Sequence, residues 1–322
     1  LGLTGLIPHA VETIEGQASR VLDQMKEYET PDEQSIFLME LLDTNEILFY
    51  YVLLHHPGEL LPIVYTPGIS AMIKRYSHWF RRPRGLYITF DDIDRIDDVL
   101  AHRPHGQLDG VVVTDSSGIL GIGDQGVGGI GITTGKLLLD VMCGAVRPER
   151  TLGIALDVGT DNQELLEDPL YLGWRHHRVD DASYFTFIDR FIEALHNACP
   201  GVLVHWEDIA TPHAQQILQR TRDRICTYND DVYGTGVVVL GTLLSALQAT
   251  GERLEDQRIV IYGAGCAGIG AADIICQQIR AEGGRSPEAA IWAIDVDGLL
   301  HEESQVNEMQ SIYARATDEL VS

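Results

Sequence analysis

Residues 202–208 read VLVHWED, an apolar run that closes on two carboxylates, and residues 225–231 read ICTYNDD, which repeats the arrangement. Each run begins like a buried strand of a parallel sheet, and ligands of such sheets bind at the carboxyl ends of the strands. Acidic oxygens that meet at one sheet edge repel each other unless a hard cation such as Mg²⁺ or Mn²⁺ lies between them. The two stretches therefore predict a parallel α/β sheet with a metal site.

The candidate metal ligands are Glu207, Asp208 and one or both of Asp230 and Asp231. Carboxylate oxygens are the ligands that these hard cations prefer. The competing interpretation is that the same residues cap helices or lie at solvated strand ends, which aspartate often does. The residues alone leave both interpretations open.

Composition narrows the class of protein. The 322-residue chain carries 23 basic and 48 acidic residues, a formal net charge of −25. This charge argues against nucleic acid or an anionic membrane as a partner. The five cysteines are scattered and form no CxxC pair, which fits a reducing cytoplasm better than disulfides or zinc. No apolar run is expected to approach the roughly 20 residues of a membrane span, so we predict a cytoplasmic protein that makes no contact with membrane.

Hydrophobic periodicity divides the chain. Residues 9 to about 80 carry apolar side chains at helical spacing, and Pro31 marks a helix start. Short apolar runs then alternate with helical patterns, which is typical of a parallel sheet. We predict an α/β protein with an N-terminal helical region at 1–84, a central parallel-sheet α/β domain at 85–229, and a truncated Rossmann NAD-binding domain at 230–322.

A dinucleotide motif opens this last part. Residues 263–268 read GAGCAG, follow the apolar run 258–262, and precede a predicted helix. In that context Gly263, Gly265 and Gly268 allow a tight turn and a close approach to a pyrophosphate. Asp295 closes the next predicted strand, where an acid binds the adenosine ribose and repels a 2′-phosphate, which favours NAD over NADP. The competing interpretation is a glycine-rich turn that only packs a helix on a sheet.

A second glycine-rich stretch, residues 118–136, ends in Gly135-Lys136. A P-loop interpretation fails because Ile130 stands where a glycine is needed and Leu137 where serine or threonine is needed. Lys136 is expected at the head of an apolar helix, and a neighbouring cation would lower its pKa so that it could act as a base. Tyr65, between two prolines, is either a core tyrosine or a proton donor.

Eight motifs in order along the chain resemble those of the malic enzymes. They are residues 63–67, 82–86, 112–115, 119–124, 135–137, 156–160, 206–208 and 228–231. The resemblance implies specific roles. Glu207, Asp208 and Asp231 match the metal ligands, Lys136 the general base, Tyr65 the general acid, and Gly263, Gly265, Gly268, Asp295 and Asp231 cofactor-binding positions, with Asp230 beside the metal or substrate.

The resemblance also implies a reaction. (S)-Malate would be oxidised by NAD⁺ as Lys136 removes the hydroxyl proton, and the product would lose CO₂ with Mn²⁺ or Mg²⁺ as Lewis acid. Tyr65 would then protonate the enolate to give pyruvate. The family further suggests a homodimer or homotetramer.

The chain departs from the family at Gly118, where studied members carry an arginine; Arg84 is a candidate replacement. Full members also continue beyond the last residue of this chain, so we expect a fragment with little or no turnover. Two alternatives stay open. A malolactic enzyme would use the same residues to form lactate and CO₂ without net NADH, and a non-catalytic scaffold or regulatory subunit would use none of them.

Overall fold

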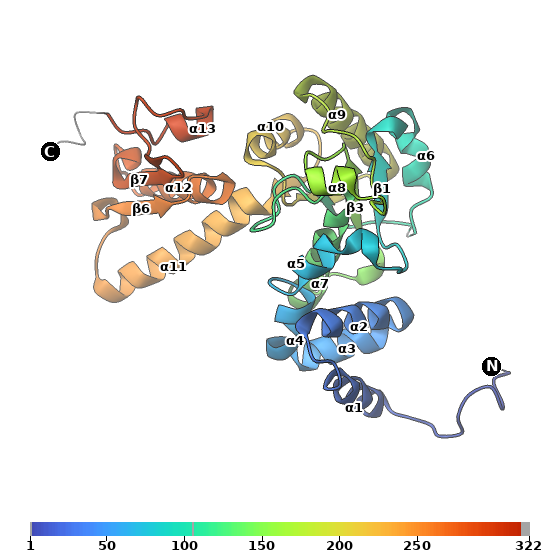
Figure 1. Ribbon diagram of the computed structural model, residues 1–322. Coiled ribbons are helices and arrows are strands. Elements are labelled where there is room, and N and C mark those ends of the chain that lie inside the picture. The colour runs from blue at the N-terminus through green and yellow to red at the C-terminus, as the bar shows by residue number, and fades with distance from the viewer. Residues whose placement is uncertain (1, 105, 317–322) are drawn as a thin grey trace.

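A five-stranded parallel sheet forms the centre of the computed structural model, which describes residues 2–104 and 106–316 (Figure 1). The strand order is β1-β3-β2-β4-β5, and every neighbouring pair is parallel. The strands are β1 (Leu86–Thr89), β2 (Gly110–Thr114), β3 (Thr151–Asp157), β4 (Leu203–Trp206) and β5 (Thr227–Asn229). The two apolar runs of the opening motif are β4 and β5, so the predicted parallel α/β sheet is confirmed.

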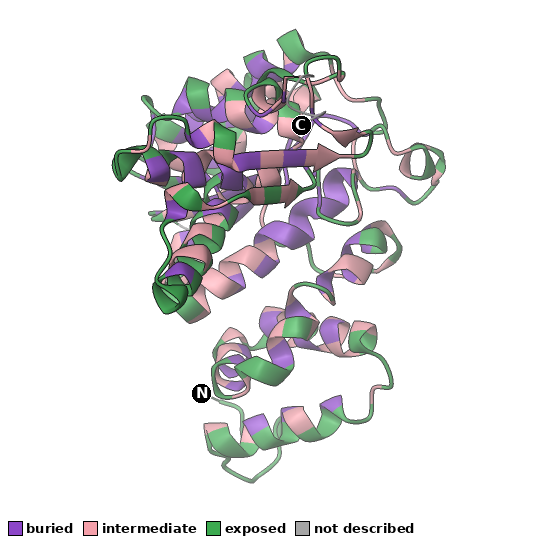
Figure 2. Ribbon diagram, turned by 90° about the vertical axis from the view of Figure 1, so that its left-hand side faces the viewer, coloured by how far each residue is buried: buried purple, intermediate pink, exposed green. Residues whose placement is uncertain are grey.

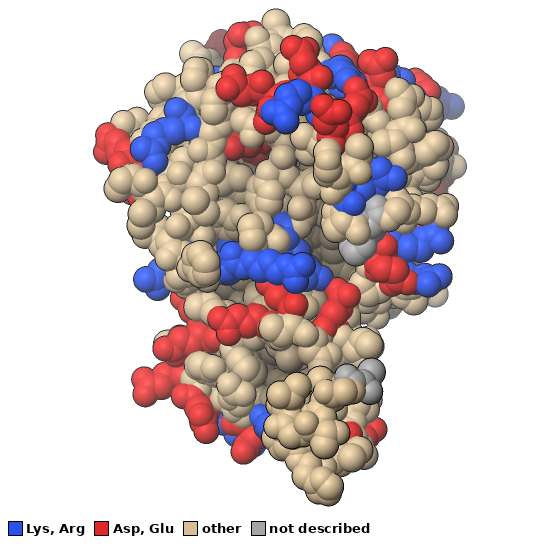
Figure 3. Space-filling model, turned by 90° about the vertical axis from the view of Figure 1, so that its right-hand side faces the viewer, with Lys and Arg blue, Asp and Glu red and all other residues tan. Residues whose placement is uncertain are grey.

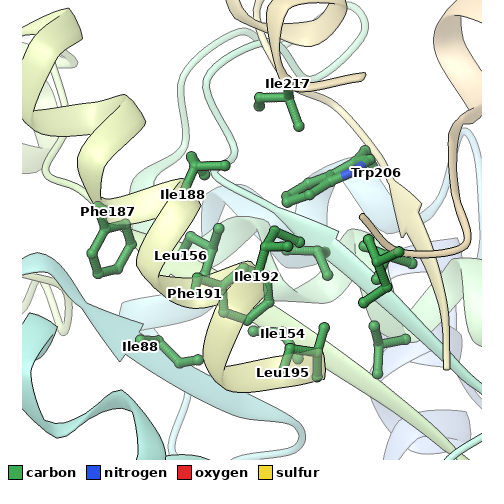
Figure 4. Close-up of a cluster of buried hydrophobic side chains, with 14 of the residues drawn as sticks. Ile88, Ile154, Leu156, Phe187, Ile188, Phe191, Ile192, Leu195, Trp206 and Ile217 are labelled. Atoms are coloured by element: carbon green, nitrogen blue, oxygen red, sulfur yellow. The ribbon is translucent and has the colours of Figure 1, made fainter. Parts of the chain in front are cut away.

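Helices cover both faces of this sheet. They are α6 (Ile96–Ala101), α7 (Ile130–Gly144), α8 (Gln163–Glu167), α9 (Asp181–Ala198) and α10 (Thr211–Thr221). Figure 4 shows Phe191 and Leu195 of α9 near Ile154 of β3 in a cluster that also includes Trp206 of β4, and Phe187 farther along α9 on the side of Ile88; all of these side chains are fully buried. Burying one such aromatic side chain contributes about 1.5–3 kcal/mol. The opposite face packs on α7, so the end of β4 is held between two helical layers.

The N-terminal region is helical, as predicted. Its helices are α1 (Ile14–Met25), α2 (Pro31–Thr44), α3 (Glu46–His55), α4 (Pro57–Val64) and α5 (Ile69–Lys74). Pro31 is the first residue of α2. Thr30 and Glu33 form a capping box, in which the side chain of each accepts a hydrogen bond from the backbone N–H of the other. The helices bury a core of their own that also contains Leu138 of α7. This shared contact fixes the helical region against the sheet.

A second, smaller unit follows the sheet. It contains α11 (Thr235–Thr250), β6 (Ile259–Tyr262), α12 (Cys266–Ala281), β7 (Ile291–Asp295), β8 (Gly298–Leu299) and α13 (Glu308–Ser311). β6 and β7 are parallel, as a Rossmann unit requires, and β8 is antiparallel to β7. Figure 1 shows α11 running obliquely from the first sheet along this unit. Figure 2 shows that buried residues lie on the inner faces of the helices and strands.

The expectation that no apolar run approaches the length of a membrane span is wrong. The helical segments Gly126–Gly144 and Asp230–Thr250 are both long and apolar enough to cross a membrane by length and composition. The first is a core helix that covers the sheet, and core helices meet the same criterion. The second packs on α12 but leaves Val237 and Val238 exposed. Two such helices are weak grounds for a membrane span.

Candidate active site and metal centre

Four carboxylates gather at the carboxyl edge of the first sheet. Glu207 and Asp208 follow β4, and Asp230 and Asp231 follow β5 in a π-helical turn, Asp230–Gly234. Because Trp206 pairs with Asn229 in the parallel ladder, the two strand ends lie side by side. The backbone N–H of Asp208 donates to Asp231 Oδ2 over 2.8 Å. The sheet register thus places all four predicted acidic residues at one edge. Among the described residues, the group of possible ligand atoms that lie within 4.8 Å of one another comprises Glu207, Asp230 and His205, without Asp208 or Asp231.

The electrostatics of these carboxylates favour a cation. Burial raises the pKa of Asp208 from its ordinary 3.8 to about 8, and repulsion from Asp231 and Glu207 adds to the rise. Burial likewise raises the pKa of Asp231 to about 6, with Glu207 adding repulsion. Asp208 also adopts a left-handed backbone, with φ +53°. Buried acidic oxygens that repel one another fit a hard divalent cation such as Mg²⁺ or Mn²⁺.

Lys136 points into the same cluster. Its Nζ lies 2.7 Å from Glu207 Oε1 and 2.8 Å from Asp230 Oδ2. The expected position at a helix head is wrong, because α7 begins at Ile130 and Lys136 lies in its middle. The expected lowering of its pKa concerns a bound cation and stays a prediction, because the pKa of Lys136 described next is that of the protein without one. Burial alone would lower the pKa of Lys136, but Glu207, Tyr65 and Asp230 raise it well above its ordinary range.

Tyr65 faces Lys136 and Glu207 from the C-terminal end of α4. Its hydroxyl lies 3.5 Å from Glu207 Oε1, and the Lys136 ammonium lies 5.4 Å from the centre of its ring. Burial, with the negative charge of Glu207, raises the pKa of Tyr65 to about 12. Gly135 makes room for the ring, since a Cβ there would stand 2.7 Å from Tyr65 Cδ2. A phenol and an amine therefore converge on one carboxylate.

Gly118 lies against this cluster. Its backbone N–H donates to the Asp208 carbonyl over 3.1 Å, and a Cβ added to it would lie 3.1 Å from the backbone of Ala210. The close approach of the two loops suits a residue without a side chain.

Arg84 does not replace the missing arginine, so that expectation is wrong. Arg84 precedes β1 and therefore lies at the amino edge of the sheet, opposite the carboxylates. There its guanidinium pairs with Asp43 and Glu46 and lines a cavity of about 540 Å³. Figure 3 shows acidic and basic side chains next to one another across the middle of one face.

The glycine turn of the second unit has the predicted context. Gly263 follows β6 with φ +104°, and α12 begins at Cys266. A Cβ on Gly268 would stand 1.9 Å from the Gly263 carbonyl oxygen, whereas one on Gly265 would meet nothing within 4 Å. Asp295 ends β7, and the Gly263 N–H donates to the Ile294 carbonyl beside it. The turn and the acid thus lie at the same sheet edge.

The sequence did not predict several residues that contact the carboxylates or the glycine turn, or that hold the loop after β2. Gln310 donates to both Asp295 Oδ2 and the Ala264 carbonyl. Arg178 is largely buried and pairs with Asp124, holding the loop after β2. His205 contacts Glu207, and its position two residues earlier on the same strand was a usable sign, because alternate residues share a sheet face.

Comparisons with known proteins agree with this architecture. Residues 42–222 match the family model described as malic enzyme, N-terminal domain, and residues 232–322 match malic enzyme, NAD binding domain. The NAD-dependent malic enzyme of Cronobacter sakazakii is 46% identical over 92% of this chain and 53% of its own length. That of Shewanella loihica is 45% identical over 93% of this chain and 54% of its own length.

A solved structure has a similar fold. The malic enzyme of Entamoeba histolytica aligns with a TM-score of 0.51 at 21% identity, covering 98% of this chain and 56% of that one. At this identity the likeness concerns the fold alone. The chain spans about half the length of the curated relatives that it matches.

Proposed function

Because the chain belongs to the malic enzyme family, we propose that it supplies the metal-binding and proton-transfer residues for oxidative decarboxylation of (S)-malate to pyruvate and CO₂, with reduction of NAD⁺. The observation that carries this proposal is the convergence of Lys136 and Tyr65 on Glu207, beside the buried carboxylates of Asp208 and Asp231. The names of the curated relatives support NAD as the cofactor.

We propose Glu207, Asp208 and Asp231 as the ligands of Mn²⁺ or Mg²⁺, and Gly263, Gly265, Gly268 and Asp295 as the NAD-binding residues. When bound, the cation supplies Lewis acidity toward the substrate oxygens, and the nicotinamide accepts a hydride. Lys136 takes the proton from the malate hydroxyl. This requires that a cation offset the carboxylates that now raise its pKa. Tyr65, which keeps its proton at neutral pH, delivers a proton to carbon.

An assay of the complete gene product tests this function. Incubated with malate, Mn²⁺ and either NAD⁺ or NADP⁺, it is expected to form pyruvate and NADH in equal amounts, with NAD⁺ preferred. Chelation of the cation should stop the reaction. Lactate without NADH would contradict the proposal, and so would a lack of any malate-dependent product.

The glycine turn offers a test that separates folding from cofactor binding. Gly268→Ala is expected to destabilise the second unit by about 1–3 kcal/mol, because its methyl group collides with the Gly263 carbonyl. Gly265→Ala is the matched control, because open space surrounds that position. It should keep the thermal unfolding temperature but weaken NAD⁺ binding in calorimetry, since a methyl group there hinders the approach of the pyrophosphate. Equal unfolding temperatures for the two variants would contradict this assignment.

Three further features of the protein are proposals. We propose a cytoplasmic location, supported by five free cysteines. A homodimer or homotetramer follows from the family resemblance, and sedimentation of the gene product would test it. We also propose domain boundaries after residues 84 and 229, because the strands of the first sheet lie between Leu86 and Asn229.

A further inference from the structure

A second polar layer lies behind Glu207, on the α7 side of the sheet. Trp206 projects into the α9 core (Figure 4), so its neighbour on the strand, His205, projects to the opposite face. His205 is buried, with 3% of its surface exposed, and its Nε2 lies 2.8 Å from Glu207 Oε2. Its Nδ1 lies 2.7 Å from the hydroxyl of Tyr228, its cross-strand neighbour in β5. A continuous chain of hydrogen bonds therefore reaches the carboxylate from behind.

The chemistry of the partners fixes the direction of these bonds. A carboxylate only accepts, so His205 Nε2 must carry the proton and donate it to Glu207. In the neutral imidazole, Nδ1 is then an acceptor, and the Tyr228 hydroxyl donates to it. Both ring nitrogens are used, so His205 has no free lone pair for a cation. Its nitrogen lies within 4.8 Å of oxygens of Glu207 and Asp230, but in this arrangement it supports a ligand and is not one itself.

These hydrogen bonds determine which carboxylate oxygen of Glu207 faces the proposed metal site. Oε2 is held by His205, whereas Oε1 faces Lys136 and Tyr65. The backbone N–H of Glu207 also donates to the Val113 carbonyl, which anchors the residue to β2. With the backbone and one oxygen fixed, the side chain cannot rotate to offer both oxygens to the same partner.

We propose that His205 and Tyr228 are positioning residues that hold Glu207 so that it engages the metal centre through Oε1 alone. The inference rests on the proposed metal site and concerns the residues that orient one of its ligands. Residues that orient metal ligands by hydrogen bonds typically contribute 10- to 100-fold to metal affinity. The effect should therefore be visible in cation binding itself, without turnover.

Titration of the complete gene product with Mn²⁺ alone tests this, by calorimetry and by the electron paramagnetic resonance of free Mn²⁺. His205→Leu keeps the size of the side chain but cannot donate, and it is expected to weaken Mn²⁺ binding by about 10- to 100-fold. His205→Gln can still donate through its amide and should recover most of the affinity. His213→Leu is the control, because His213 pairs with Asp181, away from the carboxylates, and its Mn²⁺ affinity should equal that of the wild type.

Tyr228→Phe provides an independent variant if His205→Leu does not fold. It removes only the hydroxyl that fixes the histidine tautomer, and it should weaken Mn²⁺ binding by a smaller factor while leaving the unfolding temperature nearly unchanged. Pulsed paramagnetic resonance of bound Mn²⁺ should show no coupling to a histidine nitrogen.

The outcomes separate the two proposals. If the wild type binds no Mn²⁺, the metal site fails and this inference fails with it. If the wild type binds Mn²⁺ and the folded His205 and Tyr228 variants bind it equally well, the positioning role alone is overturned. Nitrogen coupling to the bound ion would also overturn it, because His205 would then be a ligand.

Discussion

Replacing Lys136 with methionine is expected to lower kcat for malate oxidation by about 10²- to 10⁴-fold, the contribution typical of a positioned acid or base. Methionine fills a similar volume but cannot accept a proton. Because the lysine ammonium now neutralises Glu207 and Asp230, its removal leaves these oxygens free for a cation. Mn²⁺ should therefore bind at least as tightly as in the wild type, which distinguishes loss of the base from loss of the site.

Lys74 offers a matched control for this prediction. It lies at the end of α5 and has an exposed side chain. Lys74→Met should keep wild-type kcat and Mn²⁺ affinity. A Lys136→Met enzyme with near-normal kcat would exclude this lysine as the base, and one that no longer binds Mn²⁺ would assign it a structural role.

Replacing Asp208 with asparagine is expected to abolish Mn²⁺ binding over the accessible range, a larger loss than the 10- to 100-fold typical of residues that only support a ligand. The same substitution should raise the unfolding temperature of the cation-free protein, because asparagine is neutral without a proton, whereas burial and repulsion from Asp231 and Glu207 require Asp208 to take up a proton on folding. Calorimetry and thermal unfolding measure the two effects. Asp189→Asn, which alters a partly exposed ion pair with Arg220 and Arg224, should not change Mn²⁺ affinity.

The pH dependence of this stability has a definite sign. The folded protein holds the Asp208 proton up to about pH 8, whereas the ordinary pKa is 3.8. Between these values the folded state binds more protons than the unfolded state, so stability falls as pH rises. The unfolding temperature of the cation-free wild type should drop from pH 5 to pH 8, and that of the Asp208→Asn variant should drop less. A wild-type protein that becomes more stable over this range would contradict the burial of the Asp208 carboxyl group.

The parts that the sequence predicted best are those set by strand direction. Apolar runs that close on carboxylates indicated parallel strands, and parallel strands bring their carboxyl ends to one edge. The same reasoning would have excluded Arg84, because a residue that precedes a strand lies at the amino edge. His205 was likewise accessible from the two-residue period of β4, since it shares a face with Glu207.

The start of α7 could not be predicted in this way. Glycine is unfavourable within a helix, so the glycines before Lys136 indicated a loop. The fold uses them for packing instead, since a Cβ on Gly131 would lie 3.0 Å from Ile73 and one on Gly135 would lie 2.5 Å from Ile69. Helix contacts with α5 thus outweigh the local preference. The carboxylate pKa values also depend on burial, which a linear pattern does not contain.

The π-helical turn at Asp230–Gly234 has a mechanical consequence. At one end, Asp231 is hydrogen-bonded to the loop after β4, and at the other end the chain continues directly into α11. The middle of the turn touches α12, where a Cβ on Gly270 would stand 2.3 Å from the Val232 carbonyl. A rotation of the second unit relative to the first sheet is therefore expected to move the carboxylate of Asp231. The turn therefore connects the proposed cation site to the proposed dinucleotide site. By thermodynamic reciprocity, the factor by which one ligand changes the affinity for the other is the same in both directions.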